Sequence, residues 1–233
     1  MPDILFQDKL WSAVFSGLVV TLALTVFSMI LGLALGTIVA VARVHGGRWL
    51  SLAAGAYVFV LRGVPLLILL FLFYYGLPRI PLLRGTWFWD LVLVSPFRTA
   101  LFVLALNNSA YLAEIIRGGL LGVQRGLVEA GRAVGMSSFL IFKRVEAPIA
   151  LRAILGNLGN ETIAVMKASA ITSVITVHDL MGGPTVVGNL YLDPFTPLLV
   201  VGVFYLALVA VIDFGVGRAQ SWLKVSAGPM PSG

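Results

Sequence analysis

The stretch WSAVFSGLVVTLALTVFSMILGLALGTIVAVA, residues 11–42, contains no charged side chain. An α-helix rises about 1.5 Å per residue, so roughly 20 apolar residues cross the hydrocarbon core of a bilayer. This stretch is long enough to cross at a tilt and to extend beyond the core. It therefore predicts a transmembrane helix, and with it a membrane protein.

The composition of the whole chain agrees with this prediction. Of its 233 residues, 59% are hydrophobic and 11% are charged, whereas about 25% are charged in soluble domains. The chain has no cysteine, which excludes disulfides, thiolate metal sites and cysteine nucleophiles. Its formal charge of +6 is spread over loops, so we expect membrane lipid around the chain and no nucleic-acid partner.

Four further apolar stretches follow the first. Together they predict an all-α integral membrane protein with five transmembrane helices in a single domain, residues 1–233. The sequence shows no internal repeat, which argues against the repeated architecture of many secondary transporters. Five helices enclose little space, so a path across the membrane would form more naturally between two such chains. Residues 225–233 are rich in Gly and Pro and are expected to be disordered. The four further spans are predicted at about residues 50–77, 96–112, 149–177 and 197–218.

The distribution of Lys and Arg predicts the orientation. Basic residues gather in the first and third connections and after the last span, and basic loops stay cytoplasmic. The N-terminus is therefore expected outside and the C-terminus inside. The connections concerned carry Arg43, Arg48, Arg117, Arg125, Arg132, Lys143, Arg144, Arg152, Arg218 and Lys224.

The third connection contains GLVEAGRAVGMSSFLIFKRVEAPIA, residues 126–150. We interpret it as two short helices joined at Gly135, where the backbone can turn sharply. Ser137 or Ser138 can cap the second helix, which we expect to end near Pro148. Such a loop is a small amphipathic structure and not a linker.

This loop resembles the conserved cytoplasmic loop of ABC importer membrane subunits, in which EAA, a glycine and an LP pair recur at fixed spacing. In that family the loop docks on the ATP-hydrolysing subunit. Gly131 and Ala147 depart from the family pattern, which usually has Ala and Leu there. The resemblance, over a coupling loop at about residues 118–148, implies ATPase-coupling roles for Glu129, Ala130, Gly131, Gly135, Val145 and Pro148.

Residues 59–78, 110–123 and 159–182 are similar to the polar amino acid branch of these permeases, most of all to those for histidine, arginine, lysine and opines. The resemblance implies a type I ABC importer subunit in the bacterial cytoplasmic (inner) membrane, moving polar, cationic amino acids or opines. It also implies a cytoplasmic ATPase dimer, an identical or homologous permease, and an extracytoplasmic solute-binding protein. The chain has no P-loop, so ATP and Mg are expected in the partner subunit.

Polar residues within the predicted spans are candidates for substrate binding, because ionisable groups at membrane depth face protein or a water-filled path. We hypothesise that Glu161 attracts the cationic part of the substrate, while Asn160 or Ser169 holds the other end. The alternative is that Glu161 and Lys167, which do not share a helix face, are members of a structural ion-pair network. Asn108 binds substrate or joins helices.

Three charged residues within the second span or just after the third have simpler interpretations. Pro65 predicts a kink that lines the pathway, with Arg62 in a structural role. Glu114 is expected to form an i,i+3 pair with Arg117, solvated near the cytoplasmic border.

Enzyme activity is not expected in this chain. The only histidines, His45 and His178, have no zinc-protease spacing, so no metal site is predicted. No serine-hydrolase motif surrounds either histidine. A secondary carrier or a membrane scaffold that transports nothing remains as the alternative to the importer.

Overall fold

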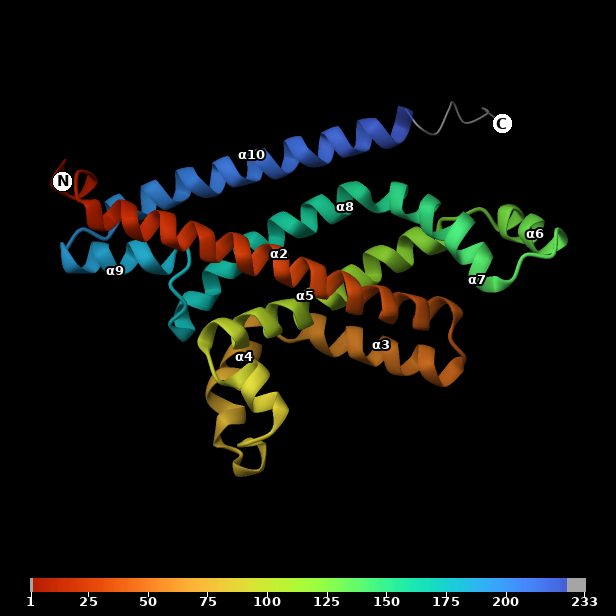
Figure 1. Ribbon diagram of the computed structural model, residues 1–233, viewed down its shortest axis with the longest axis horizontal. Coiled ribbons are helices and arrows are strands. Elements are labelled where there is room, and N and C mark those ends of the chain that lie inside the picture. The colour runs from red at the N-terminus through yellow and green to blue at the C-terminus, as the bar shows by residue number, and fades with distance from the viewer. Residues whose placement is uncertain (1, 226–233) are drawn as a thin grey trace.

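A computed structural model describes residues 2–225, and in these residues the protein is all-α, as predicted (Figure 1). The long helices are α2 (Asp8–His45), α3 (Arg48–Gly63), α5 (Pro96–Leu121), α8 (Ala147–Ala168) and α10 (Phe195–Val225). The short helices are α1 (Pro2–Leu5), α4 (Leu66–Phe71), α6 (Arg125–Ala133), α7 (Ser138–Ile141) and α9 (Gly182–Leu190). Short π-helical and 3-10 segments connect them at residues 72–83, 89–93, 142–146 and 169–175.

The tightest contact between long helices is that of α2 with α5. Small residues line the face of α2 that meets α5, which lets the two backbones approach closely. A Cβ added to Gly32 would lie 2.8 Å from Nδ2 of Asn108, and one added to Gly36 would lie 2.8 Å from the carbonyl oxygen of Ser109. A larger residue at Gly36 therefore requires a shift of the α5 backbone, and one at Gly32 requires the side chain of Asn108 to move.

The second predicted span is broken rather than kinked. Helix α3 and the segment Leu66–Arg79, which begins with α4, meet at an angle of 97°, so residues 50–77 form two helical segments and not the one kinked helix that we predicted. Pro65 has no N–H and disfavours helical geometry at the residue before it. Val64 accordingly adopts extended backbone angles, with φ of −91° and ψ of 125°.

The third and fourth predicted spans differ from the observed helices at their ends. Helix α5 continues to Leu121, past the predicted end at residue 112. Helix α8 ends at Ala168, and a 3-10 segment, Ser169–Ile175, follows it, so residues 149–177 are not one α-helix.

Length and hydropathy identify three helices able to cross a membrane within residues 2–225, namely α2, α5 and α10. The bent pair formed by α3 and α4 would be a fourth if it counts as one span. Helix α8 does not reach the hydropathy level of these helices, because it carries Arg152, Glu161 and Lys167. The five-span count and the orientation stay predictions.

Two opposite ends of the bundle can be distinguished in Figure 1. Helices α6 and α7 lie together at one end, and α9 lies at the other end beside the start of α2. Helix α10 runs along the outside of the bundle between these two ends. Most of the predicted disordered tail, residues 226–233, lies outside the described residues.

Candidate functional site

The loop between α5 and α8 has the predicted form of two helices joined by a turn. After α6, Gly135 adopts a φ of +79°, a left-handed conformation that favours glycine. The amide of Met136 donates to the carbonyl of Gly131 over 3.0 Å and closes the turn. The hydroxyl of Ser137 then accepts from the amide of Leu140 at 3.4 Å, which makes Ser137 the cap of α7.

We predicted that the second helix of the loop ends near Pro148. This is wrong, because the helix continues into α8. A π-helical turn, Phe142–Glu146, joins α7 to α8, and Pro148 lies in the first turn of α8. A proline in a regular helix removes one hydrogen bond and its ring presses on the carbonyl four residues earlier. The wider π-helical turn accommodates that ring, so α7, the π-helical turn and α8 form one continuous helical segment.

The six predicted coupling residues lie on different faces of the loop. Glu129 and Ala130 are exposed on α6, whereas Gly131 is buried against α7. A Cβ at Gly131 would lie 3.1 Å from Cγ1 of Ile141, so glycine lets the two loop helices pack closely. Gly135 and Pro148 are exposed and Val145 is half-buried. Their role in ATPase coupling stays a prediction.

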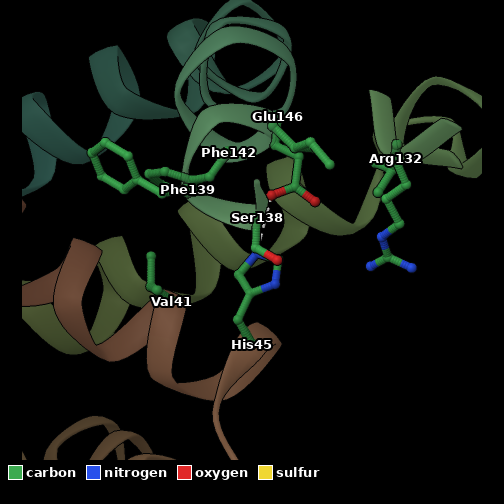
Figure 2. Close-up of a pocket in the computed structure, with 9 residues that line it drawn as sticks. Val41, His45, Arg132, Ser138, Phe139, Phe142 and Glu146 are labelled. Carbon is green, nitrogen blue, oxygen red and sulfur yellow. Dashed lines mark ion pairs between the residues drawn. The ribbon is translucent and has the colours of Figure 1, made fainter. Parts of the chain in front are cut away.

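An ion pair attaches the loop to the end of α2 (Figure 2). Nε2 of His45 lies 3.2 Å from Oε2 of Glu146, whose side chain is largely buried. Lys143 and Arg144, in the same π-helical turn, are exposed, whereas Glu146 is buried against the end of α2.

The ion pair borders a cavity of about 550 Å³ between α2 and the loop. Its walls combine two aromatic rings with charged groups, and Figure 2 shows Arg132 approaching from α6. The ring of Phe142 packs edge-on to that of His45, with centroids 6.2 Å apart. The cavity is lined by Val41, His45, Arg132, Ser138, Phe139, Phe142 and others.

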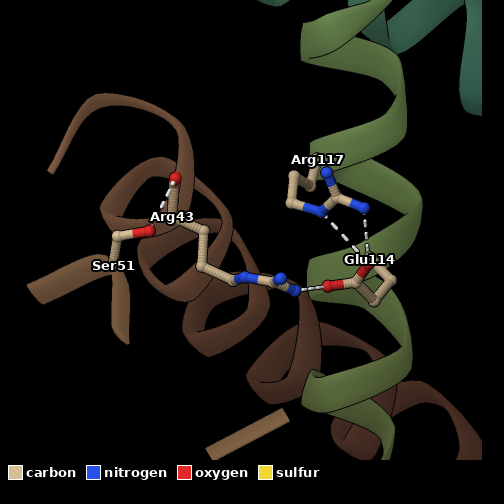
Figure 3. A network of polar contacts seen from close by, with 4 residues as sticks. All are labelled: Arg43, Ser51, Glu114 and Arg117. Atoms are coloured by element: carbon tan, nitrogen blue, oxygen red, sulfur yellow. Dashed lines mark hydrogen bonds and ion pairs between the residues drawn. The ribbon is translucent and has the colours of Figure 1, made fainter. Parts of the chain in front are cut away.

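A second charged contact joins α2 to α5 (Figure 3). Arg117 donates to Oε2 of Glu114 from two nitrogens, at 3.1 and 2.9 Å, which confirms the predicted i,i+3 pair. The guanidinium of Arg43 reaches the other carboxylate oxygen from α2. The pair is therefore part of an interhelical contact and not the isolated surface pair that we expected.

A cavity of about 310 Å³ lies between α4, α5 and α8, and Glu161 is the one charged side chain among the residues that line it. Glu161 is half-buried. Asn107, Asn108 and Tyr111 add polar groups from α5, while the rest of the wall is apolar. A small, mostly apolar cavity with a few convergent polar groups is the usual form of a site for a small molecule.

Asn108 has an unused acceptor at this cavity. Its side chain is 1% exposed, and its Nδ2 lies 3.2 Å from the sulfur of Met29. No donor in the described residues reaches its Oδ1. The neighbouring Asn107 donates its Nδ2 to the carbonyl of Leu61 at 2.9 Å. The carboxylate of Glu161 is an acceptor that suits a cation, and Oδ1 of Asn108 is a second, buried acceptor beside the cavity.

The other predicted substrate residues lie elsewhere on α8 and beyond it. Asn160 and Lys167 are exposed and are not among the residues that line the cavity. Ser169 is fully buried and donates its hydroxyl to the carbonyl of Met166 at 2.8 Å. Within residues 2–225 no ion pair joins Glu161 to Lys167. No direct contact therefore supports the alternative that these two residues belong to a structural ion-pair network.

Metal-binding side chains do not gather in the described residues. No group of three or more His, Cys, Asp or Glu residues there could hold a metal ion. His45 has a single acidic neighbour in Glu146, and His178 is exposed.

Sequence reasoning missed the residues that connect distant segments. From the sequence, Arg43 was considered only as a basic residue of a loop. His45 was considered only as a histidine that lacks the spacing of a zinc protease. Their partners, Glu114 and Glu146, are far away in the sequence, and no local pattern relates them. A basic last turn of a long helix is the one signal that points to contacts with acidic groups there.

Comparison with known proteins gives a consistent result. Residues 32–225 match the family model described as binding-protein-dependent transport system inner membrane component. The chain is 38% identical over 212 residues to the octopine transport system permease protein OccM of Rhizobium meliloti, covering 89% of this chain and 85% of the relative. It is 30% identical over 211 residues to the histidine/lysine/arginine/ornithine transport system permease protein HisM of Escherichia coli K12, covering 90% and 89%.

Solved structures show the same fold. The chain resembles a crystal structure of an amino acid ABC transporter with histidines, at a TM-score of 0.77 and 33% identity, covering 90% of this chain and 94% of that one. It also resembles an inward-facing form of the MetNI methionine ABC transporter at a TM-score of 0.69 and 24% identity, covering 92% and 96%. The second similarity supports the type I importer fold alone.

Proposed function

The chain belongs to the binding-protein-dependent transport system inner membrane components, and we propose that it is the permease subunit of an ATP-driven importer of cationic amino acids or opines. Family membership places it in the inner membrane as a permease subunit of an ABC importer. The energy source and the class of substrate are the parts that we propose.

The observation that carries the substrate class is the carboxylate of Glu161 at the cavity between α5 and α8. An unpaired carboxylate at membrane depth is costly and calls for a partner. With Oδ1 of Asn108 it offers acceptors to an ammonium or guanidinium group. The name of the HisM relative includes lysine, arginine and ornithine, whose side chains carry such groups.

The continuous helical segment formed by α7, the π-helical turn and α8 supports ATP-driven coupling. Residues from Ser138 to Ala168 are helical without a break, and Glu161 lies on this segment. A force applied to the loop by an ATPase would therefore displace Glu161, whereas a flexible turn would absorb it. ATP hydrolysis itself belongs, in this proposal, to a separate cytoplasmic ATPase dimer that holds ATP and Mg.

The outer face of α8 supports pairing with a second permease. Asn157, Asn160 and Lys167 recur at helical spacing and are all exposed. Polar groups at membrane depth face protein or a water-filled path, and an identical or homologous permease would cover them. An extracytoplasmic solute-binding protein would deliver the substrate to the resulting path.

Uptake measurements test this proposal. The chain is reconstituted in liposomes with the proteins that purify with it, and uptake of radiolabelled L-arginine is followed with and without ATP. We expect ATP-dependent uptake, and Glu161→Gln is expected to raise the half-saturating arginine concentration about tenfold or more. Asp90→Asn, which removes an exposed carboxylate away from the cavity, serves as the control.

Three outcomes would contradict the proposal in different ways. Uptake by the chain alone without ATP would favour a secondary carrier. An unchanged half-saturating concentration in Glu161→Gln would remove Glu161 from the substrate site. Absence of uptake with all partners present would favour the scaffold.

A further inference from the structure

The cavity between α5 and α8 is suited to one end of an amino acid only. Its polar groups provide acceptors, from Glu161 and Asn108, and its lining includes no cationic side chain. An amino acid also carries a carboxylate, which needs hydrogen-bond donors and preferably a positive charge when water is excluded. The cavity therefore lacks a partner for the second end of the substrate that we propose.

Arg62 lies at the neighbouring side of this cavity. Tyr111 lines the cavity of Glu161 and also a second cavity of about 460 Å³, whose walls include Arg62. The guanidinium of Arg62 is stacked over the ring of Tyr111, 5.0 Å from its centroid. Arg62 also interacts electrostatically with Glu161. Tyr111 thus borders both the cavity that holds Glu161 and the cavity that holds the guanidinium of Arg62.

Other cations of the described residues near this point are already paired or face away. Arg43 and Arg117 both form ion pairs with Glu114. Lys167 is exposed, as Arg62 is, but it lines neither the cavity of Glu161 nor the neighbouring cavity that Tyr111 shares with Arg62. Within residues 2–225 Arg62 forms no ion pair, and its stacking leaves the edge of the guanidinium free to donate.

The position of Arg62 in the fold also favours a role at the site. It lies in the last turn of α3, directly before the 97° break between α3 and α4. Broken helices at membrane depth place charged and backbone groups at transport sites. At such a break the side chain is carried by a helix end whose angle can change between transport states.

We propose that Arg62 binds the substrate carboxylate, so that Glu161 and Arg62 hold the two ends of one amino acid across the ring of Tyr111. This inference rests on the proposed transport of cationic amino acids. It goes beyond the structural role that the sequence suggested for Arg62. It also assigns the specificity for amino acids, as opposed to simple amines, to one guanidinium.

The test compares two probes that differ in one group. L-arginine has the α-carboxylate, and agmatine is the same molecule without it. Binding of both is measured by competition with radiolabelled L-arginine on the full-length chain, purified with its associated proteins. In the unaltered protein, arginine is expected to bind on the order of 10- to 100-fold more tightly than agmatine, the range for a hydrogen bond between charged groups.

Arg62→Gln is expected to weaken arginine binding until it approaches that of agmatine, while agmatine binding changes less than about threefold. Arg62→Lys keeps the charge but not the fork of donors, so part of the preference for arginine should remain. Arg98→Gln is the matched control, since Arg98 lies at the start of α5 and donates to the carbonyl of Asp90. It is expected to leave the preference unchanged.

The outcomes separate this inference from the proposed function. Equal weakening of both probes by Arg62→Gln indicates a structural role and overturns the inference, as does an unchanged preference for arginine. In both cases loss of agmatine binding in Glu161→Gln would leave the proposed function standing. If the unaltered protein binds neither probe, both proposals fail.

Discussion

Nε2 of His45 lies 3.2 Å from Oε2 of Glu146, and this contact joins the end of α2 to the loop that leads into α8. It anchors the π-helical turn of the loop against the first long helix. In the importer that we propose, the loop receives the force of the ATPase. We therefore expect the contact between His45 and Glu146 to determine whether movement of the loop is transmitted to α2.

Glu146→Ala is expected to reduce the arginine transported per ATP hydrolysed on the order of fivefold, because the loop loses its attachment to α2. His45→Ala should have a similar effect, and the double variant should be no worse than either single variant, since both remove one contact. Arg144→Ala changes an exposed neighbour in the same turn and should have little effect. Additive effects of the two substitutions would show that the contact has no part in coupling.

Glu114→Gln is expected to lower the free energy of unfolding by about 1–3 kcal/mol. The substitution leaves the guanidinium groups of Arg43 and Arg117 close together without the carboxylate that both contact. Thermal unfolding of the detergent-solubilised protein measures the change. Glu129→Gln, at an exposed carboxylate of α6, should stay within about 0.5 kcal/mol, and an equally small effect of Glu114→Gln would show that the contact between α2 and α5 contributes nothing.

Asp193 precedes α10, and its carboxylate makes the stability of this helix depend on pH. Its carboxylate accepts from the hydroxyl of Thr196 at 2.6 Å and from the amides of Thr196 and Phe195 at 3.1 and 3.2 Å. The hydroxyl of Thr196 is the main cause that lowers the pKa of Asp193 below its usual 3.8. Because the folded pKa is the lower one, the stabilisation is complete above the unfolded pKa and is lost as the pH falls through the folded pKa.

Asp193→Ala should therefore lower the Tm at about pH 7 but have a smaller effect at about pH 3. Asp193→Asn keeps an acceptor without the charge, so its Tm should be intermediate at neutral pH. Differential scanning calorimetry at both pH values measures the shifts. The same loss of Tm in the alanine variant at both pH values would contradict the role of the charged carboxylate.

Local rules predicted much of the fold and part of the site. The uncharged residues 11–42 predicted α2, the conformational freedom of glycine predicted the turn at Gly135, and the spacing of Glu114 and Arg117 predicted their pair. The angle after Pro65 was not predictable, because proline breaks a helix while the packing of α4 decides its direction. The π-helical turn before Pro148 was missed because the usual rule ends a helix there.

The contacts of Arg43, His45 and Arg62 were not predictable for a different reason. Each partner comes from another helical segment. The packing of α2 and α3 on α5 brings Arg43 and Arg62 to their partners, and the packing of the π-helical turn Phe142–Glu146 on α2 brings Glu146 to His45. Glu161 and Asn108 were found from the cost of polar groups at membrane depth. We selected Asn160 as a substrate-binding candidate for the same reason, but it is exposed on another face of α8. Periodicity alone does not say which polar face meets a cavity.

The most direct test of the account is to purify the tagged chain from gently solubilised native membranes and to identify the proteins that accompany it by mass spectrometry. We predict a P-loop ATPase in near-equal amount, which is lost in Gly135→Asp, because an aspartate is strained at a φ of +79°. Gly126→Ala, also in the loop and in open space, should retain it. A chain that purifies without an ATPase, under conditions that preserve other membrane complexes, would contradict the account.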